Sequence, residues 1–219
     1  APYPRVSLIK HYKGTTLNLQ GRIIAIDPNS AMIQATQRLT FPILDGMIHM
    51  RSKSFSGAIT ATIHPVDYAQ GTFQLSELSY GEWRERKSER VQPKYPTYLA
   101  VNYGGVVYRS FLMDISTNGM GILVNRSIHR GSGLHTGAKI LLDFQLEPAF
   151  EFKNIYGSIV YWQEVGQQLI KLGLTIFPDR DQEADLKTYI HRRHEEILAE
   201  LKQDSIRLRE PCRVENLYF

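Results

Sequence analysis

Hydrophobic and polar residues alternate along most of this chain, which is the pattern of β-strands that bury one face. In the first half, residues 15–26 and 31–36 flank an Asp-Pro-Asn-Ser segment at 27–30, which is typical of a hairpin turn. Three more alternating segments follow, at residues 43–50, 57–64 and 71–78. Five strands in about 65 residues predict a small β-barrel or sandwich. Residues 1–14 fit a short helix or an arm equally well.

The alternation resumes after a charged stretch. Near the C-terminus it is replaced by the spacing of hydrophobic residues that is typical of a helix. Six segments predict strands in the second half: residues 97–104, 106–116, 119–125, 138–146, 152–165 and 168–177. Hydrophobic residues then recur mostly every three, four or seven positions, which predicts a long amphipathic helix; they are Leu186, Ile190, Ile197, Leu201 and Leu208. Asp179 or Asp181 is available as its N-cap. We expect its first half to pack on the second barrel, and the rest is long enough for a partner helix.

Composition places few limits on function. The 219 residues are 42% hydrophobic and 22% charged, as in folded soluble proteins. No segment has the roughly 18 consecutive apolar residues of a membrane helix, and from the first residues we expect no signal peptide. The only cysteine, Cys212, excludes an intrachain disulfide and a cysteine-based metal site, and fits a cytoplasmic location. The net charge of +4 suits an anionic partner without identifying it.

These patterns divide the chain into five parts. We expect an N-terminal β-barrel at residues 1–80, a charged linker leading into the next barrel at 81–95, a second β-barrel at 96–178 and a C-terminal helix at 179–210. The final segment, residues 215–219, reads Glu-Asn-Leu-Tyr-Phe and is interpreted as the remnant of a protease-cleavage tag.

Two polar clusters are the candidates for chemistry. The first is Arg86 with Arg90, with three residues between them in the charged linker; the second is Asp114-Ile-Ser116-Thr-Asn-Gly119, at the end of a predicted strand. Each has a structural explanation by itself. Arginines in a polar stretch usually form a solvated face, and Asp-x-Ser-x-x-Gly suits a tight turn.

Taken together and in this order, the clusters carry a family resemblance. An arginine pair before a β-barrel, followed 24 positions after Arg90 by Asp-x-Ser-x-x-Gly, resembles the PilZ domain, the bacterial receptor for cyclic di-GMP. The resemblance extends over about residues 86–201. It includes RVQPKYPTYLAV as a first strand, FLMDISTNGMGILVN as a central hairpin, GSIVYW and KLGLTIF as closing strands, and LKTYIHRRHEEILAEL as a terminal helix. It implies a six-stranded barrel followed by that helix.

The resemblance also implies a ligand site, and side-chain chemistry agrees. Arginine can bind the O6/N7 edge of guanine, clamp a phosphate or stack on a purine. Ionised Asp114 suits the N1–H and N2–H donors of guanine, Ser116 can donate a hydrogen bond, and Gly119 allows close approach of a ligand. Further candidates are Arg84, Lys87, Gly121 and Trp162. Many family members have a third arginine where this chain has Glu85, so one or two bound nucleotides remain open.

Other chemistry finds little support in the sequence. His191 and His194 lack the spacing of a zinc-protease motif and stand beside two arginines, so a solvated helix face is expected for them. Gly119-Met-Gly121 lacks the further glycine of a dinucleotide loop. Tyr161 and Trp162 can line the ligand site, but core packing is the favoured role. We expect no catalytic activity, no metal and no cofactor.

The expected function is therefore that of a non-enzymatic cyclic di-GMP receptor. The ligand would bridge the linker arginines and the Asp114–Gly119 turn, which would change the mutual orientation of the two barrels. The first half is similar in architecture to the N-terminal domain of YcgR-type flagellar-brake proteins. The partner would be a protein effector in motility, secretion or biofilm formation. A ligand-dependent DNA-binding regulator and a scaffold without nucleotide are the alternatives, and monomer or dimer stays open.

Overall fold

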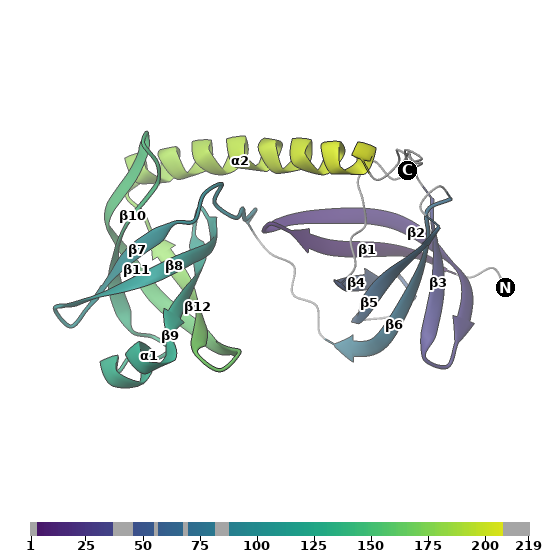
Figure 1. The fold of residues 1–219 in the computed structure, drawn as a ribbon, viewed down its shortest axis with the longest axis horizontal. Coiled ribbons are helices and arrows are strands. Elements are labelled where there is room, and N and C mark those ends of the chain that lie inside the picture. The colour runs from purple at the N-terminus through teal and green to yellow at the C-terminus, as the bar shows by residue number, and fades with distance from the viewer. Residues whose placement is uncertain (1–3, 37–45, 55–56, 68–69, 82–87, 208–219) are drawn as a thin grey trace, which may run out of the picture. The chain divides into compact units, whose positions relative to one another are not determined.

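Two closed antiparallel β-barrels make up most of the structure, a computed structural model that describes residues 4–36, 46–54, 57–67, 70–81 and 88–207. The chain divides into two compact units, residues 1–12, 16–85 and 196–219 in the first and residues 13–15 and 86–195 in the second. The predicted mainly-β fold with two barrels is thereby confirmed (Figure 1).

The first barrel has six strands in the order β1-β2-β3-β6-β5-β4, and β1 pairs with β4 to close it. The strands are β1 (Arg5–Tyr12), β2 (Thr15–Asp27), β3 (Ser30–Ala35), β4 (Gly46–Arg51), β5 (Ala58–Asp67) and β6 (Thr72–Gly81). The expectation of a helix or an arm at residues 1–14 was wrong for residues 5–12, which form β1. Val6 and Leu8 alternate with more exposed residues and are buried, because this segment fills the gap between β2 and β4.

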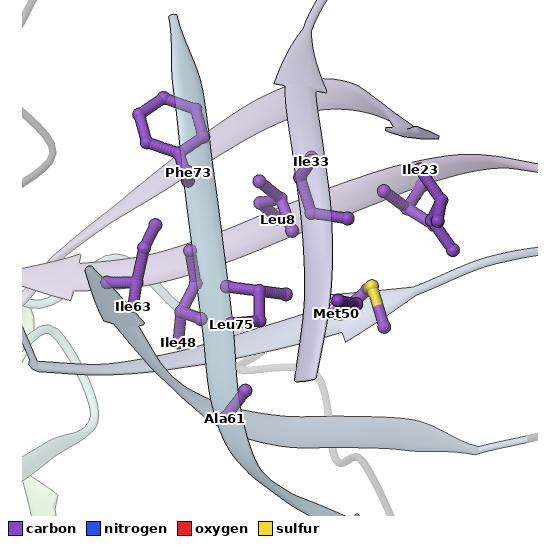
Figure 2. Packing of buried hydrophobic residues seen from close by; sticks show 11 residues of the cluster. Leu8, Ile23, Ile33, Ile48, Met50, Ala61, Ile63, Phe73 and Leu75 are labelled. Atoms are coloured by element: carbon purple, nitrogen blue, oxygen red, sulfur yellow. The ribbon is translucent and has the colours of Figure 1, made fainter. Parts of the chain in front are cut away.

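Inward-pointing aliphatic residues form the core of the first barrel. Ile33, Ile48, Ile63, Phe73 and Leu75 are fully buried and converge from the four strands β3, β4, β5 and β6 (Figure 2). Each lies two positions from another inward-facing residue or from a turn, as the period of a β-strand requires. This core explains why alternation predicted the strands from β2 to β6.

The second barrel follows the order β10-β11-β12-β9-β8-β7, and pairing of β7 with β10 closes it. Its strands are β7 (Tyr98–Tyr103), β8 (Val106–Ser116), β9 (Gly119–Asn125), β10 (Lys139–Glu147), β11 (Phe150–Val165) and β12 (Leu169–Phe177). All six were predicted from the sequence. A short helix α1 (Arg126–Ser132) was not; it begins after Asn125, whose side chain accepts a hydrogen bond from the backbone N–H of Ser127.

The terminal helix α2 (Arg180–Arg207) begins with a reciprocal cap. Oδ1 of Asp179 accepts hydrogen bonds from the backbone N–H groups of Asp181 (3.0 Å) and Gln182 (2.9 Å). In return, Oε1 of Gln182 accepts one from the backbone N–H of Asp179 at 3.1 Å. This arrangement satisfies donors that a helix start leaves unpaired. Of the two predicted cap residues, Asp179 is therefore the cap.

The first half of α2 packs on the second barrel, as predicted. Leu186, Tyr189 and Ile190 are buried, and the ring of Tyr189 meets that of Phe150 edge-on at 5.5 Å between centroids. Farther along the same helix, Ile197 is also buried. Neither described helix has the length and hydropathy required to span a membrane.

Removing the cap of α2 should weaken the fold. We expect Asp179→Ala to lower the free energy of unfolding by about 1 kcal/mol, because two N–H donors lose their acceptor. For a chain of this size the midpoint of thermal unfolding should fall by about 2–4 °C. Asp185→Ala, an exposed change within the same helix, is the matched control and should not lower it. Equal midpoints for the two variants would contradict the capping role.

Candidate functional site

A row of four residues crosses four strands of the second barrel. Asp114 on β8 pairs with Gly121 on β9, Gly121 pairs with Gly173 on β12, and Gly173 pairs with Tyr161 on β11. Paired residues in antiparallel strands lie directly opposite each other and share a face. The result is two adjacent glycines with a carboxylate at one end and an aromatic ring at the other. We call these four residues the glycine row.

The side chains of the two end residues lie over the neighbouring glycines of the row. A Cβ atom at Gly121 would lie 3.0 Å from Oδ2 of Asp114, and one at Gly173 would lie only 2.0 Å from Cε1 of Tyr161. Real Cβ contacts do not occur at the shorter of these separations. The absence of side chains at 121 and 173 is therefore what allows the carboxylate and the ring to occupy this face.

A β-bulge precedes each end of the glycine row. The register between β8 and β9 shifts between Leu112 and Asp114, and the register between β11 and β12 shifts between Ile159 and Tyr161. A bulge adds one residue to a strand and redirects the side chains that follow. Asp114 and Tyr161 therefore owe their position to irregularities in the sheet.

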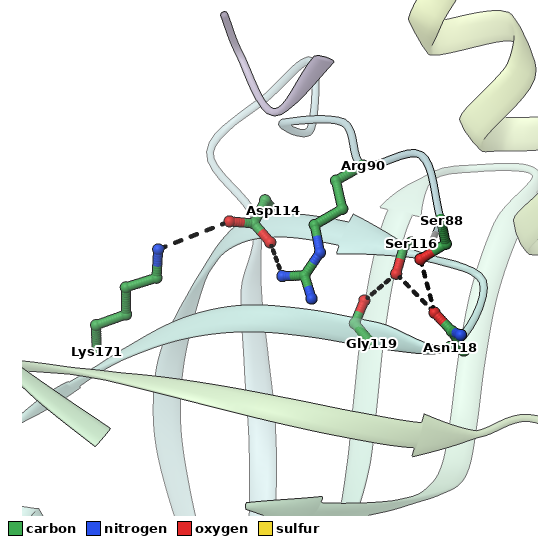
Figure 3. A network of polar contacts seen from close by, with 7 residues as sticks. All are labelled: Ser88, Arg90, Asp114, Ser116, Asn118, Gly119 and Lys171. Carbon is green, nitrogen blue, oxygen red and sulfur yellow. Dashed lines mark hydrogen bonds and ion pairs between the residues drawn. The ribbon is translucent and has the colours of Figure 1, made fainter. Parts of the chain in front are cut away.

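Two cations flank Asp114. Nη1 of Arg90 donates to Oδ1 of Asp114 at 2.8 Å, and Nζ of Lys171 lies 3.9 Å from Oδ2 (Figure 3). The side chains of Arg90 and Asp114 are largely removed from solvent. Nη2 of Arg90 lies 3.4 Å from the position that a Cβ of Gly119 would take, so the guanidinium also covers Gly119.

The turn between β8 and β9 is organised by Ser116. Its hydroxyl is buried, donates to the carbonyl oxygen of Gly119 at 3.0 Å and lies 3.3 Å from Oδ1 of Asn118. Oδ1 of Asn118 also accepts a hydrogen bond from the hydroxyl of Ser88 at 2.8 Å (Figure 3). The structure thus gives Ser116 the role expected in a tight turn, and its contact with a ligand stays a prediction.

A cavity of about 270 Å³ opens over this face. Polar side chains of Arg90, Ser88 and Asn118 line it together with apolar groups of Tyr161 and Val160. The remaining lining residues come from β9 and β12: Gly119, Gly173, Leu174 and Thr175. Of the residues predicted from the sequence, the structure places Arg90 and Gly119 in the lining, with Asp114 and Gly121 beside them.

Comparison with known proteins identifies this barrel. The sequence profile of the PilZ domain matches residues 84–192. The chain contains a PilZ domain. None of the curated proteins matches the chain in sequence.

Three solved structures match most of the chain at low sequence identity. The K. pneumonia MrkH–c-di-GMP complex is 15% identical, with a TM-score of 0.46, covering 94% of this chain and 90% of that one. YcgR in complex with c-di-GMP from Escherichia coli is 17% identical, with a TM-score of 0.48 and coverage of 92% and 88%. The Bacillus subtilis inhibitor of motility (MotI/DgrA) is 12% identical, with a TM-score of 0.46 and coverage of 90% and 98%.

The aromatic residues of β11 in the PilZ barrel are not in its core. Tyr161 is 43% exposed and Trp162 is 47% exposed, so the expectation of core packing was wrong for both. The bulge before Tyr161 turns it toward the cavity. Trp162 lies outside the cavity lining, and its ring contacts that of His129 at 5.3 Å between centroids. The predicted ligand contact of Trp162 stays a prediction.

Helix α2 of the PilZ unit holds the segment that carries Arg90. Nε of Arg193 donates to the carbonyl oxygen of Gln92 at 3.2 Å, and this arginine is only 3% exposed. Nδ1 of His194 contacts the carboxylate of Glu89, the residue before Arg90. The expected solvated face is therefore wrong for His194, although His191 is exposed. Within the described residues, no cluster of three or more His, Cys, Asp or Glu side chains has the arrangement of a metal site.

Sequence reasoning missed some residues of the PilZ site and predicted others that the structure does not describe. Lys171 was missed because only strand pairing brings it near Asp114. Ser88 and Asn118 stand inside the two motifs and were passed over as spacers. Arg84, Arg86 and Lys87 lie outside the described residues, so their roles stay predictions.

The close approach at Gly119 yields a stability prediction. A Cβ there would lie 2.9 Å from the backbone carbonyl oxygen of Leu174 on β12, so the strands must move apart. We expect Gly119→Ala to lower the free energy of unfolding by about 1–3 kcal/mol, as overpacking does. Gly131→Ala is the control, because nothing lies within 4 Å of that added methyl group. Denaturant unfolding measures both; a Gly119→Ala variant as stable as the control would contradict the packing described.

Proposed function

We propose that this PilZ protein is a receptor for cyclic di-GMP, that the ligand binds over the glycine row, and that the protein catalyses no reaction. The single observation that carries the proposal is the pairing of Arg90 with Asp114 beside a cavity floored by glycines. The presence of a PilZ domain supports the same ligand.

Arg90 and Asp114 offer complementary chemistry to a guanine base. A guanidinium has five N–H donors in a fixed fork and binds the O6 and N7 acceptors of guanine. One N–H of Arg90 donates to Asp114 in this structure, so the group can keep this bond and still bind a base. An ionised aspartate accepts from the N1–H and N2–H donors on the adjoining Watson–Crick edge of guanine. The pair can therefore distinguish guanine from adenine.

The charges near the cavity also suit the phosphates of a cyclic dinucleotide. Arg90 and Lys171 place two cations around a single carboxylate, which leaves an excess positive charge beside the cavity. Arg86, predicted as the second clamp, would add another. A dianionic ligand is attracted to such a site, and the attraction weakens as ionic strength rises.

The output that we propose is a contact with a protein partner. Ligand bound at Arg90 would also engage Arg86, and this second contact would change how the two barrels are oriented. The chain offers no helix-turn-helix or basic-region sequence that would favour DNA as the partner. Ligand-dependent retardation of DNA with a steep salt dependence would contradict this choice.

Calorimetric titration with cyclic di-GMP tests the proposed ligand. We expect the wild-type chain to bind, and Arg90→Ala and Asp114→Ala each to weaken binding about tenfold to a hundredfold, since each removes charge-assisted hydrogen bonds. Arg86→Ala should weaken it similarly.

Arg109→Ala is the matched control for the arginine changes. Arg109 is exposed on β8, five residues before Asp114, and its guanidinium lies 4.1 Å from the ring centroid of Tyr98. Its removal should leave affinity unchanged. Undiminished binding by the Arg90→Ala and Asp114→Ala variants would refute the proposed site, and no binding by the wild-type chain would refute the proposed ligand.

A further inference from the structure

We propose that Tyr161 is the residue on which a base of the bound dinucleotide stacks. We also propose that Gly173 is required because only a glycine leaves space for the Tyr161 ring at that position. This inference rests on the proposed function and extends it by assigning the face of the base as well as its edge. The sequence analysis had favoured packing in the barrel core as the role of Tyr161.

The exposure of Tyr161 is the first argument. A tyrosine ring that served only to fill the barrel would be buried, yet this ring is 43% exposed and lines the cavity. The bulge at Val160 directs it to the outer face of the sheet, where it crosses the neighbouring strand above Gly173. An aromatic ring laid flat on a glycine of the next strand is a recognised way of covering a strand glycine. That contact fixes one side of the ring and leaves the other available to a ligand.

The layout of the glycine row is the second argument. Asp114 and Tyr161 stand three strand spacings apart, about 14 Å between backbones at about 4.8 Å per spacing. Both side chains fold inward over the glycines between them, which shortens the gap from each end. A planar base lying over this row meets a carboxylate at its edge and an aromatic ring at its face. No side chain rises from positions 121 and 173 to obstruct it.

The cavity also has the size and the division of polarity that a single base requires. Its volume of about 270 Å³ is just below the roughly 300–1,000 Å³ of pockets that enclose whole small ligands. It therefore suits one base with part of its sugar. Arg90, Ser88 and Asn118 supply hydrogen-bonding groups, whereas Tyr161 and Val160 supply apolar surface. Purine bases need both, because their edges are polar and their faces are not.

Trp162 is the competing aromatic residue, and the geometry favours Tyr161. Adjacent residues of a strand point to opposite faces. Trp162 pairs with Leu172 in place of Gly173, contacts His129 and does not line the cavity. The two residues therefore give opposite expectations in one experiment.

Titrations with cyclic di-GMP on four variants decide between these roles. Tyr161→Ala should weaken binding about tenfold to a hundredfold, the usual loss when a stacking ring is removed. Tyr161→Phe should bind within about threefold of the wild-type chain, because stacking needs the ring and not the hydroxyl. Trp162→Ala should bind as the wild-type chain does. Tyr156→Ala, an exposed tyrosine on the same strand outside the cavity lining, is the matched control.

Each outcome has a distinct meaning. Wild-type affinity in Tyr161→Ala, or a loss in Trp162→Ala alone, would overturn the assignment of Tyr161 while leaving the proposed function intact. Equal losses in Tyr161→Phe and Tyr161→Ala would also overturn it, because the hydroxyl and not the ring would then be responsible. Absence of binding by the wild-type chain would overturn both proposals. Circular dichroism of each variant distinguishes loss of binding from loss of fold.

A double-mutant cycle tests the role of Gly173 separately. Gly173→Ala places a methyl group where the ring now lies, so it should expel the ring and reduce affinity about as much as Tyr161→Ala does. In the double variant the methyl group meets no ring, and affinity should fall no further than in Tyr161→Ala, within about threefold. Losses that multiply would show that the two residues act independently and would refute the seating role.

Discussion

Strand register in the second barrel is the constraint on which the rest of the site depends. Closure through β7 and β10 fixes the order of the strands, and pairing then brings Asp114, Gly121, Gly173 and Tyr161 into one row. A slip of one residue in any of these strands would send its side chains to the opposite face. The two bulges are part of the same constraint, since they set the register at each end of the row.

The ion pair between Arg90 and Asp114 then joins two distant segments of sequence. Arg90 lies before the barrel begins, and it reaches Asp114 because Val91 pairs with Ile115 through two backbone hydrogen bonds of 3.0 Å. Arg193 and His194 of α2 hold the same segment from the other side. The segment that carries Arg90 therefore connects the cavity to the terminal helix. The two helix residues contact a backbone carbonyl and a carboxylate close to Arg90 in the sequence.

Local patterns predicted more of the fold than of the site. Alternation placed nearly every strand, and the candidate N-caps Asp179 and Asp181 placed the start of α2, because these features depend on neighbouring residues. The strand at Arg5–Tyr12 was missed because a short segment shows its role only when the barrel closes. Arg90, Asp114 and Gly119 followed from the family motifs. Lys171, Tyr161 and Gly173 depend on pairing across strands and on a bulge, neither of which leaves a local signal.

The central claim is that cyclic di-GMP binds over the glycine row. Its most direct test is a titration of the ¹⁵N-labelled full chain with cyclic di-GMP, followed by the backbone amide resonances. The account predicts that the largest shifts are those of Gly119, Gly121 and Gly173, with shifts at Arg90 and Asp114. Shifts confined to residues of the first barrel, or saturating binding that leaves these three glycines unmoved, would contradict it.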